Sequence, residues 1–237
     1  MTSNKPLIFL GSNVAISQFA ETAQDLNIEV AGIIDGDYYG NTESIDGIPI
    51  IDSEQSFNDA EKLEYYRQNY VFFCATNWIP QDDAVSKRNK EKRHRLIDLI
   101  DQSDLPCMNI IDPRAKIHSS TKLGKGIYID SFALVDPNVT IGDYTTVYAF
   151  SGLGHGSTFG RNCVIQRHIS ITGDVTFGDN VFLGTACKIL KTGVTISSGT
   201  FVHEAIYLKR GTIENEIISR NGVNTKRVLH REELEVA

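Results

Sequence analysis

The chain has few cysteines, and none lies close to another. Its 237 residues include four of them, Cys74, Cys107, Cys163 and Cys187, with no CxxC pair and no spacing typical of metal ligands. Secreted domains that depend on disulfides carry more cysteines at shorter spacings. We therefore expect reduced thiols, a cytoplasmic location and no bound metal.

Long apolar runs and an excess of positive charge are also missing. The longest apolar stretches, such as KPLIFLG and YVFFCA, are far shorter than the roughly 18 residues that cross a bilayer, and we expect neither a membrane span nor a secretory signal. The net charge of −7 excludes a general nucleic-acid binder, which needs clustered Lys and Arg. The expected partners are small molecules and other protein chains.

Residues 5–112 alternate short apolar segments with helical patterns. PLIFLGS, IEVAGIID and NYVFFCATN are predicted to be buried strands, with IDGIPII as a short extended piece. VAISQFAETAQDL places Ile16, Phe19, Ala20 and Ala23 on one helical face. A long polar helix is expected over about 82–101, and PCMNIID ends the unit. Because helices usually connect parallel strands, residues 1–112 are predicted to form an α/β domain with a parallel sheet.

Beyond Pro113 a six-residue period replaces this pattern. A large apolar residue occupies every sixth position: Ile117, Leu123, Ile129, Val135, Ile141, Val147, Leu153, Phe159, Ile165, Ile171, Phe177, Leu183 and Ile189. After a one-residue slip at Gly193 the period resumes at Ile196, Val202 and Leu208. Three such hexads make one triangular coil of about 18 residues in a parallel β-helix. We predict this fold for residues 113–211, with residues 212–237 as a C-terminal extension that caps its open end.

Glycine often follows the large apolar residue directly. The glycines in this place are Gly124, Gly142, Gly154, Gly160, Gly178 and Gly184. We expect them to occupy turns that need a permissive backbone conformation.

The two halves together resemble a known family. The segment IIDGDYYGNTESIDGIPII and the repeats KIHSSTKLGKGIYI, VTIGDYTTV and VTFGDNVFLGTACKI are similar to those of the two-domain bacterial sugar-nucleotide N-acetyltransferases of the di-N-acetylbacillosamine and N-acetylperosamine type, with the related sialic acid O-acetyltransferases. The resemblance implies a Rossmann-like sugar-nucleotide-binding domain, a left-handed β-helix and a homotrimer. It also implies transfer of acetyl from acetyl-CoA to an amino group of a nucleotide-linked deoxyamino sugar in surface-glycan biosynthesis, with UDP as the expected nucleotide.

The resemblance makes His155 the catalytic residue. The family's catalytic histidine follows a repeat's IGD by twelve residues, and here IGD ends at Asp143. His155 comes two residues after the core position Leu153, so we expect it at a coil corner, where imidazole could take a proton from an amine. A polar corner would equally accept a histidine with no catalytic role.

One departure from the family adjoins this histidine. The acidic residue that the family commonly has next is replaced by Gly156. Either another carboxylate such as Asp130 or Asp136 takes its place from a neighbouring coil, or the amine is acetylated largely through positioning. The backbone N–H of Gly173 is a candidate donor to the thioester oxygen.

The remaining site predictions concern substrate and cofactor binding. Gly11, Ser12 and Asn13 form a strand-to-helix turn that either binds a phosphate or is an ordinary capped turn. Asp35 either contacts the uracil or ribose or is a turn residue. Three small residues are Gly173, Gly184 and Ala186. They could let the pantetheine arm lie against the β-helix, or they could simply be what tight coils require.

Three other functions remain open from the sequence. An O-acetyltransferase of the sialic acid type would share the architecture but need a stronger base, so the missing acid weighs against it. A non-catalytic β-helix scaffold or sugar-nucleotide-binding protein would tolerate the reduced glycine content of the turn at Gly11. Transfer of another acyl group is the third.

Overall fold

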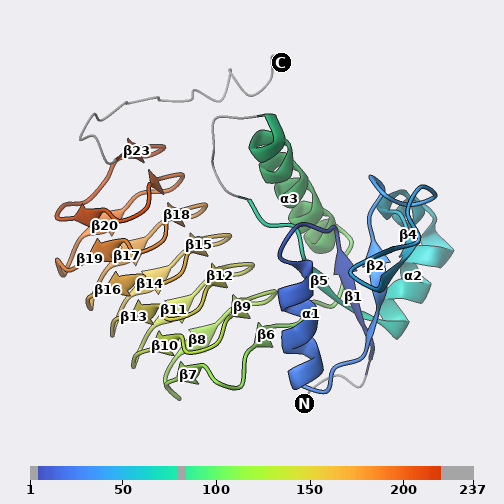
Figure 1. The fold of residues 1–237 in the computed structure, drawn as a ribbon, viewed down its shortest axis with the longest axis horizontal. Coiled ribbons are helices and arrows are strands. Elements are labelled where there is room, and N and C mark those ends of the chain that lie inside the picture. Colours follow the sequence, from blue (N-terminus) through green and yellow to red (C-terminus); the bar gives the residue numbers. More distant parts are fainter. Residues whose placement is uncertain (1–4, 79–83, 220–237) are drawn as a thin grey trace. The chain divides into compact units, whose positions relative to one another are not determined.

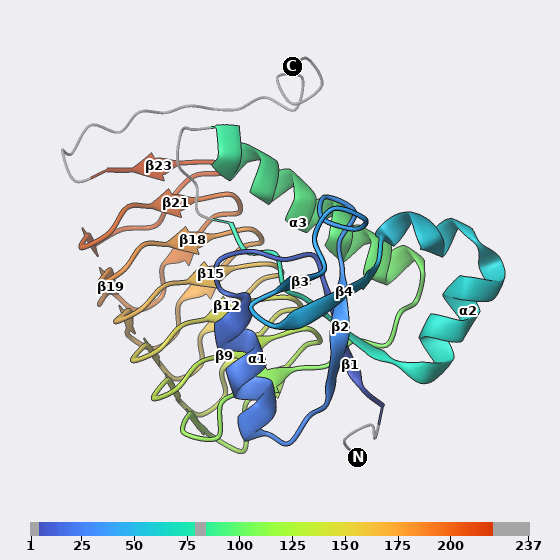
Figure 2. The ribbon, with the colours of Figure 1, turned by 45° about the vertical axis from the view of Figure 1, so that its right-hand side comes forward.

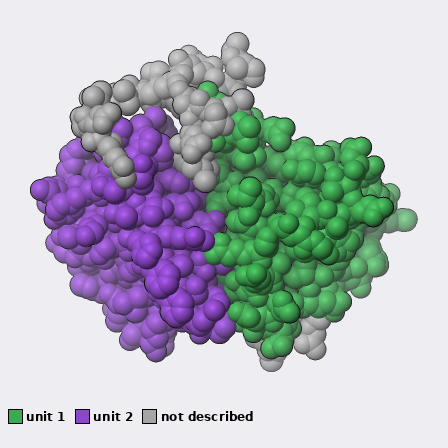
Figure 3. Space-filling model, viewed as in Figure 1, with its two compact units in different colours: residues 1–110 green, residues 111–237 purple. Residues whose placement is uncertain are grey.

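A computed structural model describes residues 5–78 and 84–219 of the chain. The chain divides into two compact units, Met1–Ile110 and Ile111–Ala237, which are coloured separately in Figure 3. This boundary lies two residues before the predicted one. In the described residues no helix is long and apolar enough to cross a membrane.

Unit 1 contains a mostly parallel sheet and helices (Figure 2). Its elements are β1 (Leu7–Leu10), α1 (Ile16–Asp25), β2 (Val30–Ile34), β3 (Ser44–Ile45), β4 (Ile48–Asp52), the 3-10 helix η1 (Glu54–Asn58), α2 (Ala60–Asn69), β5 (Val71–Cys74) and α3 (Ala84–Gln102). The strand order is β3-β4-β2-β1-β5. All pairs are parallel except β3 with β4. The predicted α/β domain with a parallel sheet is confirmed, and its Rossmann-like character stays a prediction.

The core of unit 1 follows from its apolar patterns. Every residue of β1 is fully buried, as expected for a strand inside a parallel sheet that is covered on both faces. The predicted stripe of α1 is confirmed, because Phe19 is buried and its ring lies 5.2 Å from that of Phe73. The helix α2 was not predicted. Of its residues only Tyr66 is buried, so the sequence carries no apolar stripe there, and the Asp59 carboxylate caps its first turn.

Unit 2 is a three-sided parallel β-helix (Figure 1). One side contains β6 (Ile110–Ile111), β9 (Tyr128–Ile129), β12 (Thr146–Val147), β15 (Val164–Ile165), β18 (Phe182–Leu183), β21 (Phe201–Val202) and β23 (Ile217–Ile218). The second contains β7 (Lys116–Ile117), β10 (Leu134–Val135), β13 (Gly152–Leu153), β16 (Ser170–Ile171), β19 (Lys188–Ile189) and β22 (Tyr207–Leu208). The third contains β8 (Lys122–Leu123), β11 (Thr140–Ile141), β14 (Thr158–Phe159), β17 (Thr176–Phe177) and β20 (Thr195–Ile196).

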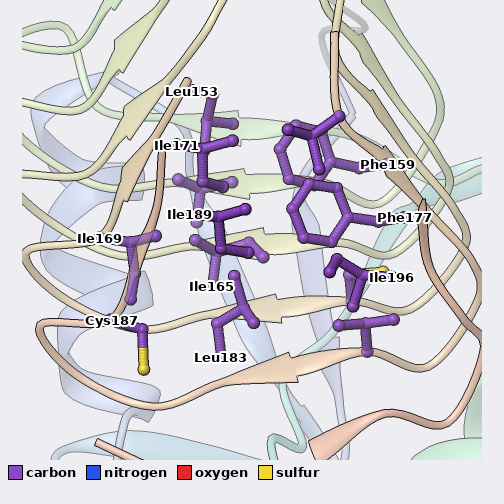
Figure 4. Close-up of a cluster of buried hydrophobic side chains, with 14 of the residues drawn as sticks. Leu153, Phe159, Ile165, Ile169, Ile171, Phe177, Leu183, Cys187, Ile189 and Ile196 are labelled. Atoms are coloured by element: carbon purple, nitrogen blue, oxygen red, sulfur yellow. The ribbon is translucent and has the colours of Figure 1, made fainter. Parts of the chain in front are cut away.

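The strand register confirms the predicted hexad repeat. Val135 pairs with Leu153, and Leu153 pairs with Ile171, so residues one coil apart stack directly. Figure 4 shows the resulting columns of buried side chains, in which the rings of Phe159 and Phe177 stack 4.5 Å apart. The predicted slip at Gly193 is also present, because Phe177 pairs with Ile196.

The reason given for the recurring glycines was wrong. Gly142 and Gly154 do not have positive φ angles; that conformation falls two residues later, as at Tyr144 and Gly156. A Cβ on Gly154 would instead lie 2.4 Å from the carbonyl carbon of Thr172 in the next coil. Glycine is needed there because the next coil approaches too closely for a side chain.

Both predicted ends of the β-helix also need correction. Ile110–Ile111, assigned from the sequence to the first domain, forms β6 and extends a side of the β-helix. The β-helix also continues beyond residue 211, because β23 pairs with β21. The rest of the predicted C-terminal extension, residues 220–237, lies outside the described residues.

Candidate functional site

His155 lies where the predicted hexad phase places it, at the corner between β13 and β14. Leu153 is buried in the core, and the chain turns immediately after it, with Gly156 in the left-handed region at φ 69°. The His155 side chain is 64% exposed. A ring in this position can meet a ligand from solvent.

The ring of His155 lies against Gly173, in the following coil. A Cβ built on Gly173 would lie 2.4 Å from Cε1 and 2.5 Å from Nε2 of His155. Only a residue without a side chain leaves this space to the imidazole. Gly173 therefore belongs to the surroundings of His155, and its role as a donor to a thioester oxygen stays a prediction.

The carboxylate beside His155 belongs to Asp174. Its Oδ2 lies 4.0 Å from Nε2 of His155, and its side chain is 65% exposed. The suggestion of Asp130 was wrong, because this buried carboxylate accepts hydrogen bonds from the backbone N–H groups of Ser131 and Ala149, at 2.7 and 3.1 Å. The sequence could have indicated this carboxylate, because Asp174 follows Gly156, the residue after the histidine, by one coil.

The face before the His155 corner has a position without a side chain. Gly152 pairs in register with Leu134 on one side and Ser170 on the other. A Cβ on Gly152 would meet nothing within 4 Å. The outer surface is therefore open at this point, three residues before the imidazole.

The other two residues predicted to bind the cofactor lie at a different corner. Gly184 and Ala186 connect β18 to β19, whereas Gly173 connects β16 to β17. A Cβ on Gly184 would lie 2.6 Å from the backbone nitrogen of Glu204, so coil packing already requires glycine there. Their contact with a pantetheine arm stays a prediction.

In unit 1 the predicted turn residues gather at the carboxyl ends of neighbouring strands. Gly11 follows β1 with φ 73°, and a Cβ there would lie 2.1 Å from Oγ1 of Thr76, after β5. The Thr76 hydroxyl is buried and has no hydrogen-bond partner among the residues that the structure describes. Ser12 donates from Oγ to Oδ2 of Asp35 at 2.7 Å. Asn13 accepts from the N–H of Ala15 at 2.8 Å, a turn that leads into α1.

Asp35 lies at the centre of a buried ion-pair cluster. It has no exposed surface, and its Oδ1 lies 2.6 Å from Nζ of Lys92, on α3. The same ammonium lies 2.7 Å from Oδ2 of Asp37. The hydrogen bond from Lys92 lowers the pKa of Asp37. A nucleotide could reach Asp35 only if this cluster rearranged, and sequence reasoning did not pair Lys92 with Asp35.

The described residues hold neither a candidate thiol nucleophile at the His155 corner nor a metal centre. Cys163 is fully buried, and burial raises the pKa of its thiol to about 12. Burial likewise raises the pKa of the Cys187 thiol to about 11. No group of three or more His, Cys, Asp or Glu side chains suited to a metal ion occurs among the residues described.

Comparisons with known proteins agree with this architecture, although no family model matches the chain. Over 93 residues the chain is 28% identical to the acyl-[acyl-carrier-protein]–UDP-N-acetylglucosamine O-acyltransferase of Chlamydia pneumoniae, a match that spans 34% of this chain and 33% of that protein. The chain thus aligns with only about a third of the length of that relative.

Solved structures match over most of the chain. A mutant perosamine N-acetyltransferase from Caulobacter crescentus, in complex with CoA and GDP-perosamine, has a TM-score of 0.72 at 19% identity over 90% of this chain and 92% of that one. The acetyltransferase domain of PglB from Neisseria gonorrhoeae has a TM-score of 0.76 at 16% identity over 92% and 97%. The chain therefore has the fold of these acetyltransferase structures, and its repeated parallel sheets fit the left-handed β-helix that the sequence resemblance implied.

Proposed function

We propose that this protein is an acetyl-CoA-dependent N-acetyltransferase that acts on the amino group of a nucleotide-linked deoxyamino sugar. The observation that carries this proposal is the exposed imidazole of His155, which lies against Gly173 at a coil corner with a carboxylate beside it. The fold likeness supports it, because a structure of this fold was solved with CoA and GDP-perosamine. Surface-glycan biosynthesis is the setting that the sequence resemblance implies.

Direct transfer without an acyl-enzyme fits the groups present. The lone pair of the uncharged sugar amine attacks the thioester carbonyl carbon and forms the C–N bond. His155 takes a proton from the nitrogen, the C–S bond breaks, and the proton then reaches the departing thiolate. The products are the N-acetylated sugar and CoA with a free thiol. A donor such as the N–H of Gly173 would stabilise the oxyanion of the intermediate.

The two units are proposed to bind different parts of the substrates. Unit 1 would act as a Rossmann-like nucleotide-binding domain, because Gly11, Ser12 and Asn13 follow a parallel strand at its carboxyl end, where ligands bind in open α/β sheets. Direct contact of the nucleotide with Asp35 would require its ion pair with Lys92 to rearrange. UDP is the proposed nucleotide. In unit 2 the open surface at Gly152 would leave space for a substrate arm beside His155.

A homotrimer is also proposed, and an exposed aromatic column supports it. Phe132, Phe150 and His168 stack along one coil corner, with ring centroids 5.1 Å apart in each pair. Both phenylalanines are more than half exposed. They also have φ angles of 58° and 59°, which are unfavourable for bulky residues. A second copy of the chain would bury these rings. Light scattering should give the mass of a trimer, and Phe150→Asp should reduce it; a monomeric wild type would contradict this proposal.

The activity test measures thiol release from acetyl-CoA with UDP-, dTDP- and GDP-linked amino sugars. We expect turnover with at least one amine, and a kcat at least about tenfold lower for His155→Ala, since a positioned base contributes roughly 10² to 10⁴ in rate. His203→Ala, at another exposed corner, is the matched control and should keep wild-type kcat. No turnover with any amine, together with no CoA binding, would refute the enzyme proposal.

The position of Asp174 also favours a second candidate, O-acetylation of a sugar hydroxyl. A hydroxyl needs a stronger base than an amine, and the missing acid at Gly156 argued against it. Asp174 supplies a carboxylate beside the ring from another coil. Sialic-acid-like sugars should therefore be included among the acceptors, and the identity of the acetylated atom decides between the two reactions.

A further inference from the structure

We propose that Asp174 is the positioning residue of His155, placed one coil further along the chain rather than next to the histidine in sequence. This inference rests on the proposed acetyl transfer. The carboxylate would orient the imidazole and stabilise the positive charge that the ring acquires while it holds the proton of the amine.

The geometry at the corner assigns this role to Asp174. Its Oδ2 faces Nε2 of His155 at 4.0 Å, while Gly173 leaves the space in which the ring lies. Hydrogen bonds at catalytic groups are often long in structures without substrate and shorten in the complex. The two residues therefore form one unit across neighbouring coils.

Gly156 is part of the same arrangement. A Cβ at Gly156 would lie 2.3 Å from Oδ1 of Asp174. The carboxylate thus occupies the space beside the histidine that a side chain at position 156 would fill. A side chain at position 156 would compete with the present position of the Asp174 carboxylate, and the φ angle of 69° at this position also favours glycine.

Other corner aspartates in unit 2 have a different task. Oδ1 of Asp143 accepts from the N–H of Lys125 at 2.9 Å, and Oδ1 of Asp179 accepts from the N–H of Arg161 at 2.7 Å. Each of these carboxylates joins its coil to the previous one. Asp174 instead faces the imidazole of His155, a side chain that can take up a proton, so its carboxylate can act in the proposed transfer.

The test compares Asp174→Asn with Asp174→Glu and the control Asp179→Asn. Asparagine suits the backbone at position 174, where φ is 58°, because Asn138 has φ 61° at the same place two coils earlier. We expect Asp174→Asn to lower kcat about fivefold, the size of an exposed charge interaction, with both KM values unchanged. Asp174→Glu should recover part of the loss, and Asp179→Asn should keep kcat.

A second measurement does not depend on turnover. Diethyl pyrocarbonate acylates imidazole, and the rate at His155 can be followed by mass spectrometry at one fixed pH. The ring gains positive charge in this reaction too, so Asp174→Asn should slow it about threefold, with Asp179→Asn unchanged. Charged groups on the same corner in adjacent coils, Asp136 and Lys191, are retained in every variant.

The outcomes separate this inference from the proposed function. If the wild type transfers no acetyl group but Asp174→Asn slows acylation of His155, the enzyme proposal fails and the pairing stands. If turnover is present and Asp174→Asn matches the wild type in both kcat and acylation rate, the pairing is refuted. Equal losses in Asp174→Asn and Asp179→Asn would show a merely structural role and overturn it as well.

Discussion

Gly173→Ala should displace the imidazole of His155 while leaving the β-helix intact. The three atoms nearest to a Cβ at this position all belong to the ring of His155, at 2.4, 2.5 and 2.7 Å. Gly173 is not among the residues with positive φ, so the backbone accepts alanine. The ring must move by about 1 Å to relieve the contact, a displacement that can cost roughly 10² in rate.

The expected cost in stability is small because the ring is 64% exposed and can rotate into solvent. A change below about 1 kcal/mol would shift Tm by only about 2–4 °C in a chain of this size. Gly154→Ala is the matched control, since its Cβ would meet the backbone carbonyl carbon of Thr172 at 2.4 Å. The backbone cannot move aside as a side chain can, so the free energy of unfolding of this variant should be lower by at least about 1–3 kcal/mol.

The assay combines thiol release from acetyl-CoA with thermal unfolding. Gly173→Ala should have a lower kcat and an unchanged Tm, whereas Gly154→Ala should have a lower Tm. The double variant His155→Ala with Gly173→Ala should be no slower than His155→Ala alone, because the added methyl then has no ring to displace. Wild-type kcat in Gly173→Ala, or a fall in Tm equal to that of Gly154→Ala, would refute the reasoning.

Three further predictions concern the stability and thiol chemistry of the chain. Lys92→Met should lower the free energy of unfolding in urea by about 3–5 kcal/mol, because it leaves the fully buried Asp35 without its cation; a milder loss in the double variant with Asp35→Asn would confirm the cause, and equal losses would contradict it. Cys163 should not react with dithionitrobenzoate at about pH 8 until urea unfolds the chain, since burial raises its pKa to about 12 and disfavours the thiolate; rapid labelling of the native protein would be inconsistent with this. A hydrogen bond from Arg114 lowers the pKa of Asp112 below its ordinary 3.8. The contribution of Asp112 to the free energy of unfolding is therefore complete above pH 3.8 and is lost as the pH falls through the lower pKa of the folded state. Urea midpoints at about pH 5 and pH 3 should therefore differ less in Asp112→Asn than in the wild type.

Much of the fold was predictable because its signals are periodic. The hexad of large apolar residues defined the β-helix, its slip at Gly193 and the corner position of His155, since each core position fixes where its neighbours point. The alternation of apolar and helical segments similarly predicted the sheet of unit 1. The helix α2 escaped because it buries only Tyr66 and so has no apolar stripe.

The candidate site was predictable only in part. The count to His155 could be made along the chain, and the corner prediction is confirmed. The carboxylate was sought in Asp130 or Asp136, and the recurring glycines were assigned to turn conformation. Both questions depended on distances between successive coils, which sequence spacing does not give.

The sequence by itself determined the repeat, the core columns and the corner that carries His155, because these follow from which side chains avoid water. The tertiary structure decided what surrounds the imidazole. Asp174 lies beside it and Gly173 beneath it because strands of neighbouring coils pair in register, so that residues about one coil apart come into contact. At position 156 the Asp174 carboxylate of the next coil lies where a side chain would extend, and the φ angle of 69° also favours glycine there.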